Sequence, residues 1–299
     1  MFGGVRMELN KITTRKQRSL NVYEWSAKEA KAVVVLVHGA SEHIDRYKEF
    51  AEYLVNNNIT VYGYNHLGHG ENKHADVRGV YFEDNKGEET LVNDLEDVCL
   101  YVQANNNCPL FVFGHSMGSL IARGFAVKTT LKVKGIILCG SLHPSKLIVK
   151  SGLGYAKVRA NISGKKDISR SLNKMAFGSF NERISYNKDN VRDYANDPNC
   201  GLYFSNQAIV DLLSLIDFIT TEGNIKKMIK TDYLIISGAD DPFSDKTKQL
   251  NAFMNCLNKN NIIFKHKFYR EMKHEILKEK GKQEVFADVV NHIESVLKG

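Results

Sequence analysis

Short runs of apolar residues, rich in β-branched and aromatic types, recur along the chain. The clearest covers residues 32–37, where every position is apolar. Uninterrupted runs of this length are typical of strands covered on both faces, as in a parallel sheet. The same pattern predicts further buried strands at residues 60–64, 110–113, 133–139, 233–237 and 262–269.

Helical periodicity lies between these strands. Apolar residues at three- and four-residue spacing mark one face over residues 91–102 and again over residues 285–297. Strands that alternate with amphipathic helices predict βαβ units, and therefore a doubly wound α/β core. In such folds the residues that carry chemistry lie at the carboxyl ends of the strands.

The alternation is interrupted once. Between residues 143 and 205 no run is typical of a buried strand, and apolar clusters mix with lysine and arginine. We therefore expect residues 1–142 and 206–299 to form the α/β core. Residues 143–205 are expected to form an inserted cap or lid.

The composition is that of an ordinary globular protein. The 299 residues are 43% hydrophobic and 25% charged, which excludes disordered and collagen-like chains. No apolar run approaches the roughly 18 residues of a transmembrane helix. The net charge is +7, but no zinc-finger spacing or RNA-recognition motif accompanies it, so nucleic acid is not the expected partner.

The distribution of charge is more informative than its total. Residues 143–205 hold 11 Lys or Arg and 5 Asp or Glu, a balance of +6, which leaves +1 for the rest of the chain. A basic cap attracts anionic lipid surfaces and phosphate head groups. We therefore expect peripheral contact with an anionic membrane surface through the cap.

Cysteine usage and the start of the chain bear on location. Five cysteines without C-x-x-C spacing favour reduced thiols over a disulfide framework. The first 20 residues lack the apolar stretch of about 7 to 15 residues that a secretory signal needs, so we expect a cytoplasmic protein. No phosphate loop, dinucleotide loop or H-E-x-x-H motif is present, and neither cofactor nor metal is expected.

A candidate nucleophile lies after the strand at 110–113. Gly114-His115-Ser116-Met117-Gly118 matches the G-x-S-x-G pattern, and a helical stretch follows it. In that context a sharp turn between strand and helix presents the serine hydroxyl at the edge of the sheet. The helix N-terminus beside it favours negative charge. The alternative is a glycine-rich turn without a catalytic role.

A second loop offers donors for an oxyanion. His38-Gly39-Ala40-Ser41-Glu42-His43 follows the strand at 32–37, so a backbone N–H here, that of Ala40, could face the nucleophile. The other donor would be the N–H of Met117, directly after the candidate serine. The alternative is an ordinary connection between a strand and a helix.

A serine nucleophile needs a base, and the base needs an acid that orients it. Asp240 and Asp241 both follow the strand at 233–237. Asp241 is favoured, because it lies farther into the loop and Pro242 fixes the backbone after it. His274, between the last strand and the last helix, is the candidate base, whereas His266 lies within the strand pattern.

These motifs together resemble the α/β-hydrolase superfamily. More narrowly, the chain is similar to the monoacylglycerol lipase and lysophospholipase group, whose sequence profile is shared with serine aminopeptidases. The resemblance rests on residues 38–47, 69–70, 114–119 and 274–277. Segments 177–181 and 197–201 also look like parts of bacterial lysophospholipases. Asn65 stands where the family often has aspartate, and residues 185–188 lack an expected tryptophan.

The resemblance implies a mostly parallel eight-stranded sheet flanked by helices, with an inserted helical cap. It places the acid at Asp241 and the oxyanion donors at Ala40 and Met117. It implies no cofactor, and it does not predict an oligomeric state.

The expected function is therefore a serine hydrolase that cleaves an ester of a single-chain lipid, a monoacylglycerol or a lysophospholipid. Apolar residues of the cap are candidates for lining an acyl tunnel: Leu147, Ile148, Val149, Leu153, Tyr155, Met175, Phe177 and Phe180. The alternative for them is simple packing of the cap onto the core. The alternative functions are a peptidase or short-chain carboxylesterase with the same residues, and a non-catalytic ligand-binding protein.

Overall fold

An eight-stranded sheet organises the computed structural model, which describes residues 7–178 and 183–299. The strand order is β1-β2-β4-β3-β5-β6-β7-β8. β1 and β2 pair antiparallel, as do β2 and β4, and the remaining pairs are parallel. The strands are β1 (Met7–Thr13), β2 (Ser19–Trp25), β3 (Ala32–Val37), β4 (Ile59–Tyr64), β5 (Leu110–His115), β6 (Gly135–Cys139), β7 (Asp232–Gly238) and β8 (Phe264–Tyr269).

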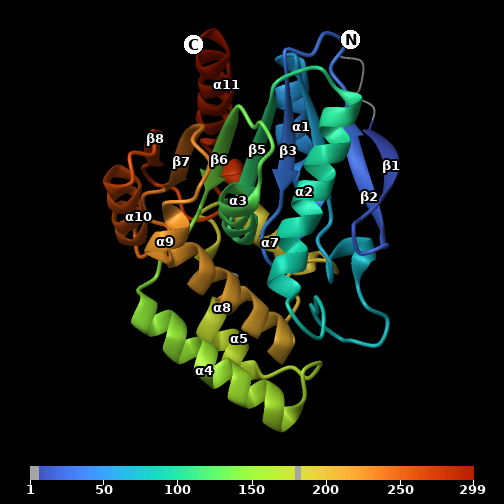
Figure 1. Cartoon of the computed structure of the whole chain (residues 1–299), viewed down its shortest axis with the longest axis vertical. Coiled ribbons are helices and arrows are strands. Elements are labelled where there is room, and N and C mark those ends of the chain that lie inside the picture. Colours follow the sequence, from blue (N-terminus) through green and yellow to red (C-terminus); the bar gives the residue numbers. More distant parts are fainter. Residues whose placement is uncertain (1–6, 179–182) are drawn as a thin grey trace.

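Helices cover the sheet and extend beyond one end of it (Figure 1). The helices are α1 (Lys48–Asn56), α2 (Gly87–Asn105), α3 (Met117–Lys128), α4 (Lys146–Ser163), α5 (Arg170–Phe177), α7 (Lys188–Asn196), α8 (Asn206–Thr220), α9 (Glu222–Ile225), α10 (Lys248–Lys259) and α11 (Lys282–Lys298). Short 3₁₀ helices are η1 (Ile44–Tyr47), η2 (Gly70–Asn72) and η3 (Ile276–Lys278). The expected α/β-hydrolase fold, a mostly parallel sheet with flanking helices, is confirmed.

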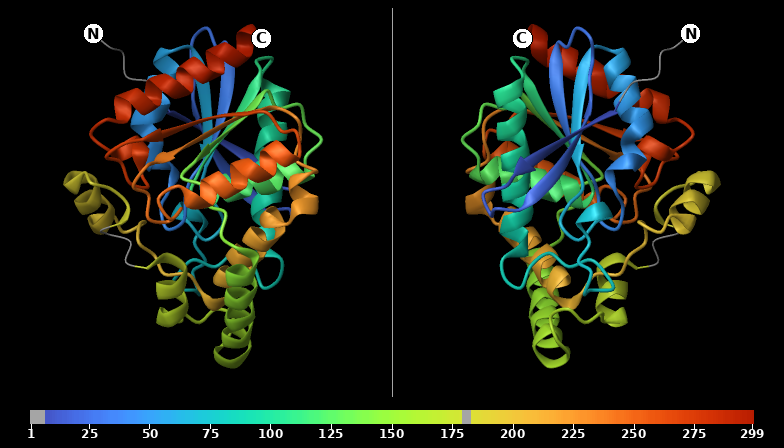
Figure 2. Two further views of the ribbon diagram at one scale, coloured as in Figure 1. Left: turned by 90° about the vertical axis from the view of Figure 1, so that its left-hand side faces the viewer. Right: turned by 90° about the vertical axis from the view of Figure 1, so that its right-hand side faces the viewer.

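Alternate residues of the central strand β3 face two separate hydrophobic layers. Val33 and Val35 pack in the layer that includes α2 and α3, whereas Val34 and Leu36 pack in the layer that includes α1 and α11. Figure 2 shows these helix pairs on opposite sides of the sheet. Burial on both faces explains why the strand has no polar position.

The hairpin of β1 and β2 lies outside the pattern of buried strands that the sequence analysis identified. β1 is largely exposed and β2 alternates between buried and half-buried residues, so neither forms an uninterrupted apolar run. Ion pairs fasten the hairpin to α2: Arg15 contacts Asp97 and Arg18 contacts Asp94. The strands expected at 133–139 and 262–269 begin two residues later, at Gly135 and Phe264.

The helices between β6 and β7 form a layer beyond the sheet. α8 packs along α4 on one side and against α3 and α2 on the other, so it joins the 143–205 segment to the core. Figure 1 shows α4 as the helix farthest from the strands. In the described ranges, no helix combines the length and apolar character needed to cross a bilayer.

Candidate active site

Ser116 occupies the sharp turn between β5 and α3. Its φ of 52° and ψ of −120° lie in a region that a residue with a Cβ atom rarely adopts. The turn lifts the half-buried hydroxyl away from the strand. It also sets Ser116 directly before the N-terminus of α3, where free N–H groups create positive potential.

The glycines on either side of Ser116 are required by close backbone approach. A Cβ atom at Gly118 would lie 2.0 Å from the Val37 carbonyl oxygen, and one at Gly114 would lie 2.4 Å from the Gly118 oxygen. Neither contact is possible for a larger residue without moving a strand or a helix. The two glycines of the G-x-S-x-G pattern are therefore needed because β5, α3 and β3 pack closely at this turn.

The imidazole of His274 lies between Ser116 and Asp241. Its Nε2 atom is 2.8 Å from Ser116 Oγ, and its Nδ1 atom is 2.9 Å from Asp241 Oδ2. His274 is buried, and its ring packs 4.5 Å from that of Phe243. The three side chains come from the carboxyl ends of β5, β7 and β8, which the parallel sheet brings together.

The Asp241 carboxylate is fully buried, but groups of the protein donate hydrogen bonds to it. Burial raises its pKa, but the His274 imidazole and the hydrogen bonds from His274, the Phe243 N–H and Ser237 Oγ outweigh this, so the pKa of Asp241 is lowered. The group is therefore ionised at neutral pH and accepts the His274 Nδ1–H.

The two competing residues lie elsewhere. Asp240 accepts a hydrogen bond from the Tyr186 hydroxyl at 3.3 Å, and among the described residues the carboxylate paired with His274 is that of Asp241. His266 is exposed on β8, between the rings of Phe264 and Phe268.

Ala40 and Met117 line the same cavity as Ser116. Met117 is the first residue of α3, so its N–H belongs to the donors that a helix leaves unpaired. In the other loop, the N–H groups on both sides of Ala40 are held: Gly39 donates to Glu42 Oε1 at 2.6 Å and Ser41 donates to His69 Nε2 at 3.1 Å. These bonds fix the backbone around Ala40.

The cavity at Ser116 has a volume of about 80 Å³ and, the serine hydroxyl apart, an apolar lining. The lining comes from the two loops, from α3, α5 and α8, and from Phe243: Ala40, Ser116, Met117, Leu120, Leu142, Ala176, Phe177, Leu212, Leu213, Ile216 and Phe243. An apolar, concave lining suits an acyl or similar hydrocarbon group.

The cap residues expected to line this cavity are mostly placed elsewhere. Of those named from the sequence, Phe177 lies at the cavity. Leu147, Ile148, Tyr155 and Met175 are instead between 44% and 81% exposed, on the outer surfaces of α4 and α5. Val149 and Leu153 pack into the core, and Phe180 lies outside the described residues. The expectation is wrong because α8, not α4, faces Ser116.

A buried polar network behind Ser116 was not predicted. Glu42 accepts hydrogen bonds from the Tyr47 hydroxyl at 2.7 Å, from His115 Nδ1 at 3.2 Å and from Arg46 Nε at 3.1 Å. Arg46 also donates a hydrogen bond from Nη2 to Glu275 Oε2 at 2.7 Å. Glu42 and Arg46 belong to the motif after β3, and His115 and Glu275 are the immediate neighbours of Ser116 and His274. That adjacency is the sequence signal for the network.

The contact between Glu42 and His115 shifts the pKa of each group toward its charged form. Burial raises the pKa of Glu42, but His115 and Arg46 outweigh it and hold the pKa well below its usual value. Burial lowers the pKa of His115, but Glu42 outweighs it and raises the pKa. The network therefore favours the charged forms of Glu42 and His115 directly behind Ser116.

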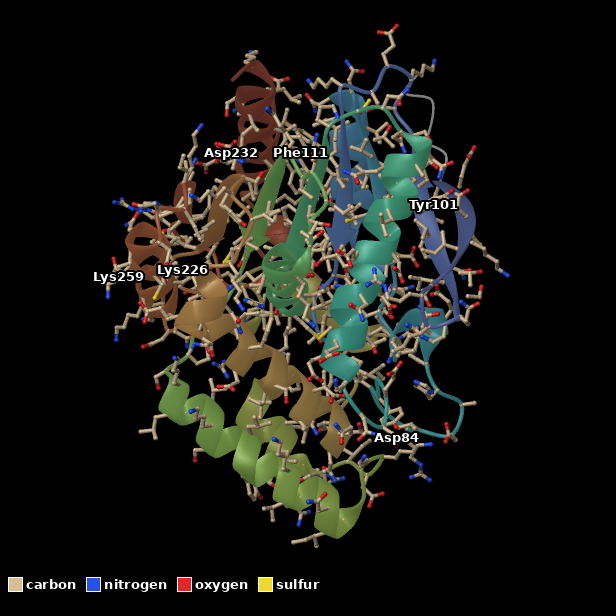
Figure 3. All side chains as sticks on the ribbon, viewed as in Figure 1. Asp84, Tyr101, Phe111, Lys226, Asp232 and Lys259 are labelled. Atoms are coloured by element: carbon tan, nitrogen blue, oxygen red, sulfur yellow. The ribbon has the colours of Figure 1, made fainter. Side chains whose placement is uncertain are left out.

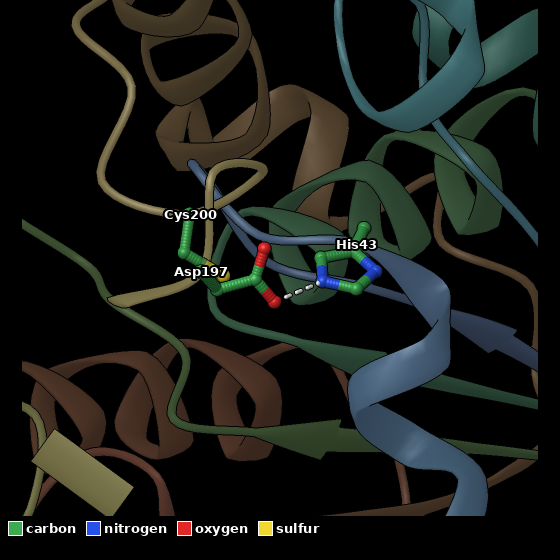
Figure 4. A group of neighbouring side chains, drawn as sticks. All are labelled: His43, Asp197 and Cys200. Carbon is green, nitrogen blue, oxygen red and sulfur yellow. Dashed lines mark hydrogen bonds and ion pairs between the residues drawn. The ribbon is translucent and has the colours of Figure 1, made fainter. Parts of the chain in front are cut away.

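One cluster in the described residues has the donor types of a metal site. His43, Asp197 and Cys200 offer ligand atoms within 4.8 Å of one another, drawn in Figure 4. His43 Nε2 is already 2.7 Å from Asp197 Oδ2, and burial raises the pKa of the Cys200 thiol to about 12, which disfavours the thiolate that would bind a metal. We therefore interpret the cluster as an ion pair that fastens the 143–205 segment to the loop after β3.

Comparison with known proteins identifies the family of the chain. Residues 28–281 match the family described as serine aminopeptidase, S33. A monoglyceride lipase homolog of Monkeypox virus is 26% identical, covering 89% of this chain and 88% of the viral protein. The phospholipase YtpA of Bacillus subtilis is 27% identical, covering 89% of this chain and 96% of its own length.

Solved structures share the fold. A lipase in its open form superposes with a TM-score of 0.87 at 21% identity, covering 98% of this chain and 100% of the lipase. A soluble variant of monoglyceride lipase from Saccharomyces cerevisiae, in complex with a substrate analogue, gives 0.76 at 21% identity, with 98% and 95% covered. Because the family match spans most of the chain, the protein belongs to the serine aminopeptidase S33 family of the α/β-hydrolase superfamily.

Proposed function

We propose that the protein is a serine hydrolase that cleaves the carboxylic ester of a single-chain lipid, a monoacylglycerol or a lysophospholipid. Ser116 is the nucleophile, His274 the general base and acid, and Asp241 the residue that orients the imidazole. The main support is the position of the His274 ring, within hydrogen-bond distance of both Ser116 Oγ and Asp241 Oδ2.

The mechanism follows from these positions. As Ser116 Oγ attacks the carbonyl carbon, its proton passes to His274 Nε2, and the imidazolium that forms is stabilised by the Asp241 carboxylate. The carbonyl oxygen becomes an oxyanion that accepts hydrogen bonds from the Ala40 and Met117 N–H groups, each such donor contributing on the order of 10²- to 10³-fold in rate. His274 then protonates the departing alcohol oxygen, which leaves an acyl group on Ser116.

Water completes the cycle. His274 takes a proton from a water molecule as its oxygen attacks the acyl carbon, and returns that proton to Ser116 Oγ when the carboxylic acid leaves. No electron transfer and no metal enter the balance.

The cavity lining supports an acyl chain as the group bound beside Ser116. Each buried methylene contributes about 0.8 kcal/mol, so the apolar surfaces of α8 and α3 favour longer chains over acetate. The names of the two relatives above, a monoglyceride lipase homolog and a phospholipase, agree with a lipid ester. A peptidase that binds the cationic amino terminus of its substrate would need a carboxylate beside the nucleophile to pair with it. The described lining of the cavity contains no carboxylate.

We also propose that residues 143–205 act as a cap that touches anionic membranes. Apolar side chains are exposed on α4 at helical spacing, among them Leu147 at 81%, Ile148 at 68% and Ile162 at 74%. Basic residues flank them within a segment of net charge +6, the combination that binds a lipid interface. Binding to anionic vesicles that does not weaken as salt rises would contradict the electrostatic part of this proposal.

The test of the proposed function combines a variant with a substrate panel. Ser116→Ala should lower kcat by on the order of 10⁶-fold and abolish labelling by a fluorophosphonate probe. Ser151→Ala, which removes an exposed hydroxyl on α4, is the matched control and should retain both. Retained hydrolysis in Ser116→Ala would reject the nucleophile.

The panel should compare monoacylglycerols and lysophospholipids of several chain lengths with short nitrophenyl esters and aminoacyl amides. We expect kcat/KM to rise with acyl length until the cavity is filled. A preference for aminoacyl amides would instead identify a peptidase, and a preference for the shortest esters a carboxylesterase.

A further inference from the structure

A larger cavity lies away from Ser116. It is a groove of about 440 Å³ between the start of α4, the end of α8, α9 and α10. We call it the basic groove, and its lining is His143, Pro144, Ser145, Lys146, Thr220, Glu222, Ile225, Lys248, Gln249, Ala252, Cys256 and Lys259. It shares no lining residue with the Ser116 cavity, although Leu142 of that cavity directly precedes His143.

The charged residues of the groove are mostly cationic. Lys146, Lys248 and Lys259 face one acidic residue, Glu222. Lys248 lies 3.5 Å from Asp245, whereas neither Lys146 nor Lys259 has a carboxylate within ion-pair distance in the described ranges. Figure 3 labels Lys259 at the end of α10. The groove therefore carries a positive potential that a bound anion would reduce.

A buried guanidinium lies directly behind the groove. Arg123 of α3 is fully buried, with its guanidinium carbon 3.8 Å from the centre of the Phe253 ring. It donates to the carbonyl oxygens of Leu142 at 2.6 Å and Ile219 at 3.3 Å, but its Nε has no hydrogen-bond partner and no carboxylate of the described chain pairs with it. An unpaired buried charge is unfavourable, and a nearby anion would offset it.

His143 connects Arg123 to the groove. An Arg123 N–H donates to His143 Nδ1 at 3.1 Å, which requires an unprotonated Nδ1 and therefore sets the proton on Nε2. Burial lowers the pKa of His143 to about 3, so the ring is neutral at pH 7. Its Nε2–H lies on the groove side, 4.0 Å from Cys256 Sγ.

The start of α4 adds to the same field. α4 has 18 residues and begins at Lys146, and the Ser145 side chain makes no capping hydrogen bond. The free N–H groups of its first turn add positive potential at the groove.

We propose that the basic groove binds a phosphate group, presented either by a soluble phosphate ester or by a lipid head group, through Lys146, Lys259 and the Nε2–H of His143. Phosphate fits these donors because its oxygens accept several charge-assisted hydrogen bonds at once. The site is separate from the ester-cleaving residues and does not depend on the proposed hydrolase activity.

The proposal is tested by calorimetric titration of the full chain with inorganic phosphate, against chloride at equal ionic strength. We expect saturable binding of phosphate that the double variant Lys146→Gln/Lys259→Gln weakens roughly tenfold or more. The matched control is Lys157→Gln/Lys134→Gln, which removes the same charge from exposed positions outside the groove and should bind within about twofold of the wild type.

A second arm identifies the source of the phosphate. Glycerol 3-phosphate is compared with an ether-linked lysophosphatidate below its aggregation concentration, which has no ester to cleave. Equal affinities indicate a soluble phosphate ester, and tighter binding of the lipid, lost in Lys146→Gln/Lys259→Gln, indicates a head group. Equal weakening by both double variants, or no phosphate binding beyond that of chloride, overturns the proposal, whereas fluorophosphonate labelling of Ser116 reports separately on the proposed hydrolase.

Discussion

The Glu42 carboxylate lies 2.6 Å from the Gly39 backbone nitrogen, so a buried anion holds the loop in which Ala40 is the next residue. The same carboxylate is 3.2 Å from His115, the residue before Ser116. Glu42 thus connects the proposed oxyanion loop to the turn that carries Ser116. In this arrangement it acts as a positioning residue, because it does not touch the cavity.

Glu42→Gln should therefore impair turnover more than substrate binding. Loss of the charge leaves His115 and Arg46 without their anion and loosens the Gly39 contact, so we expect kcat to fall on the order of 10- to 100-fold with KM little changed. Tyr47→Phe is the control, because it removes one hydrogen bond to the same carboxylate and keeps the charge. A Glu42→Gln enzyme within twofold of the wild type in kcat would show that the network is only structural.

The adjacent carboxylates Asp240 and Asp241 should differ sharply in effect. Asp241→Asn removes the acceptor of the His274 Nδ1–H and should lower kcat on the order of 10⁴-fold. Asp240→Asn alters only the exposed contact with Tyr186 and should stay near wild-type activity. Measuring kcat for both variants checks the assignment, and a reversed order would transfer the proposed role to Asp240.

The sequence predicted the parallel part of the fold well because its strands are buried on both faces. β3, β4 and β5 consist of buried residues throughout, which leaves an unmistakable apolar run. β1 and β2 lack such a run because they form an antiparallel hairpin at the sheet edge, where one face meets solvent. Their presence followed only from the family resemblance.

The candidate site was predictable where local geometry constrains residue type, and less so where packing decides. Gly114 and Gly118 mark the turn because no Cβ atom fits there. The cavity lining depended on which helix faces Ser116, and the amphipathic pattern of α4 does not say whether its apolar face meets the core or the solvent. Leu212 and Ile216 of α8 were therefore missed.

The buried carboxyl of Asp211 should make stability fall as pH rises. Burial raises its pKa to about 7 from an ordinary value near 3.8, although Gln207 donates a hydrogen bond to it. Between these two values the folded chain keeps a proton that the unfolded chain has lost, so stability decreases with pH across this window and levels off above about pH 7. The full effect corresponds to roughly 4 kcal/mol at most.

Asp211→Asn removes that penalty with almost no change in shape. At pH 8 the variant should be more stable than the wild type in urea unfolding, and at pH 4 the two should be similar. If the free energy of unfolding changed by the same amount between pH 4 and 7 in the wild type and in Asp211→Asn, Asp211 would not titrate in this window.

Two glycine substitutions should have opposite effects on the free energy of unfolding. A Cβ atom at Gly118 would lie 2.0 Å from the Val37 oxygen, whereas one at Gly154 in α4 meets no atom within 4 Å. Gly154→Ala should therefore stabilise the chain by about 0.5–1 kcal/mol, since alanine favours a helix interior. Gly118→Ala must push α3 away from β3, which should lower stability by roughly 2 kcal/mol or more and displace the Met117 N–H. The measurements are urea unfolding and the rate of fluorophosphonate labelling. A Gly118→Ala protein with the unfolding midpoint and labelling rate of the wild type would show that the substitution causes no strain.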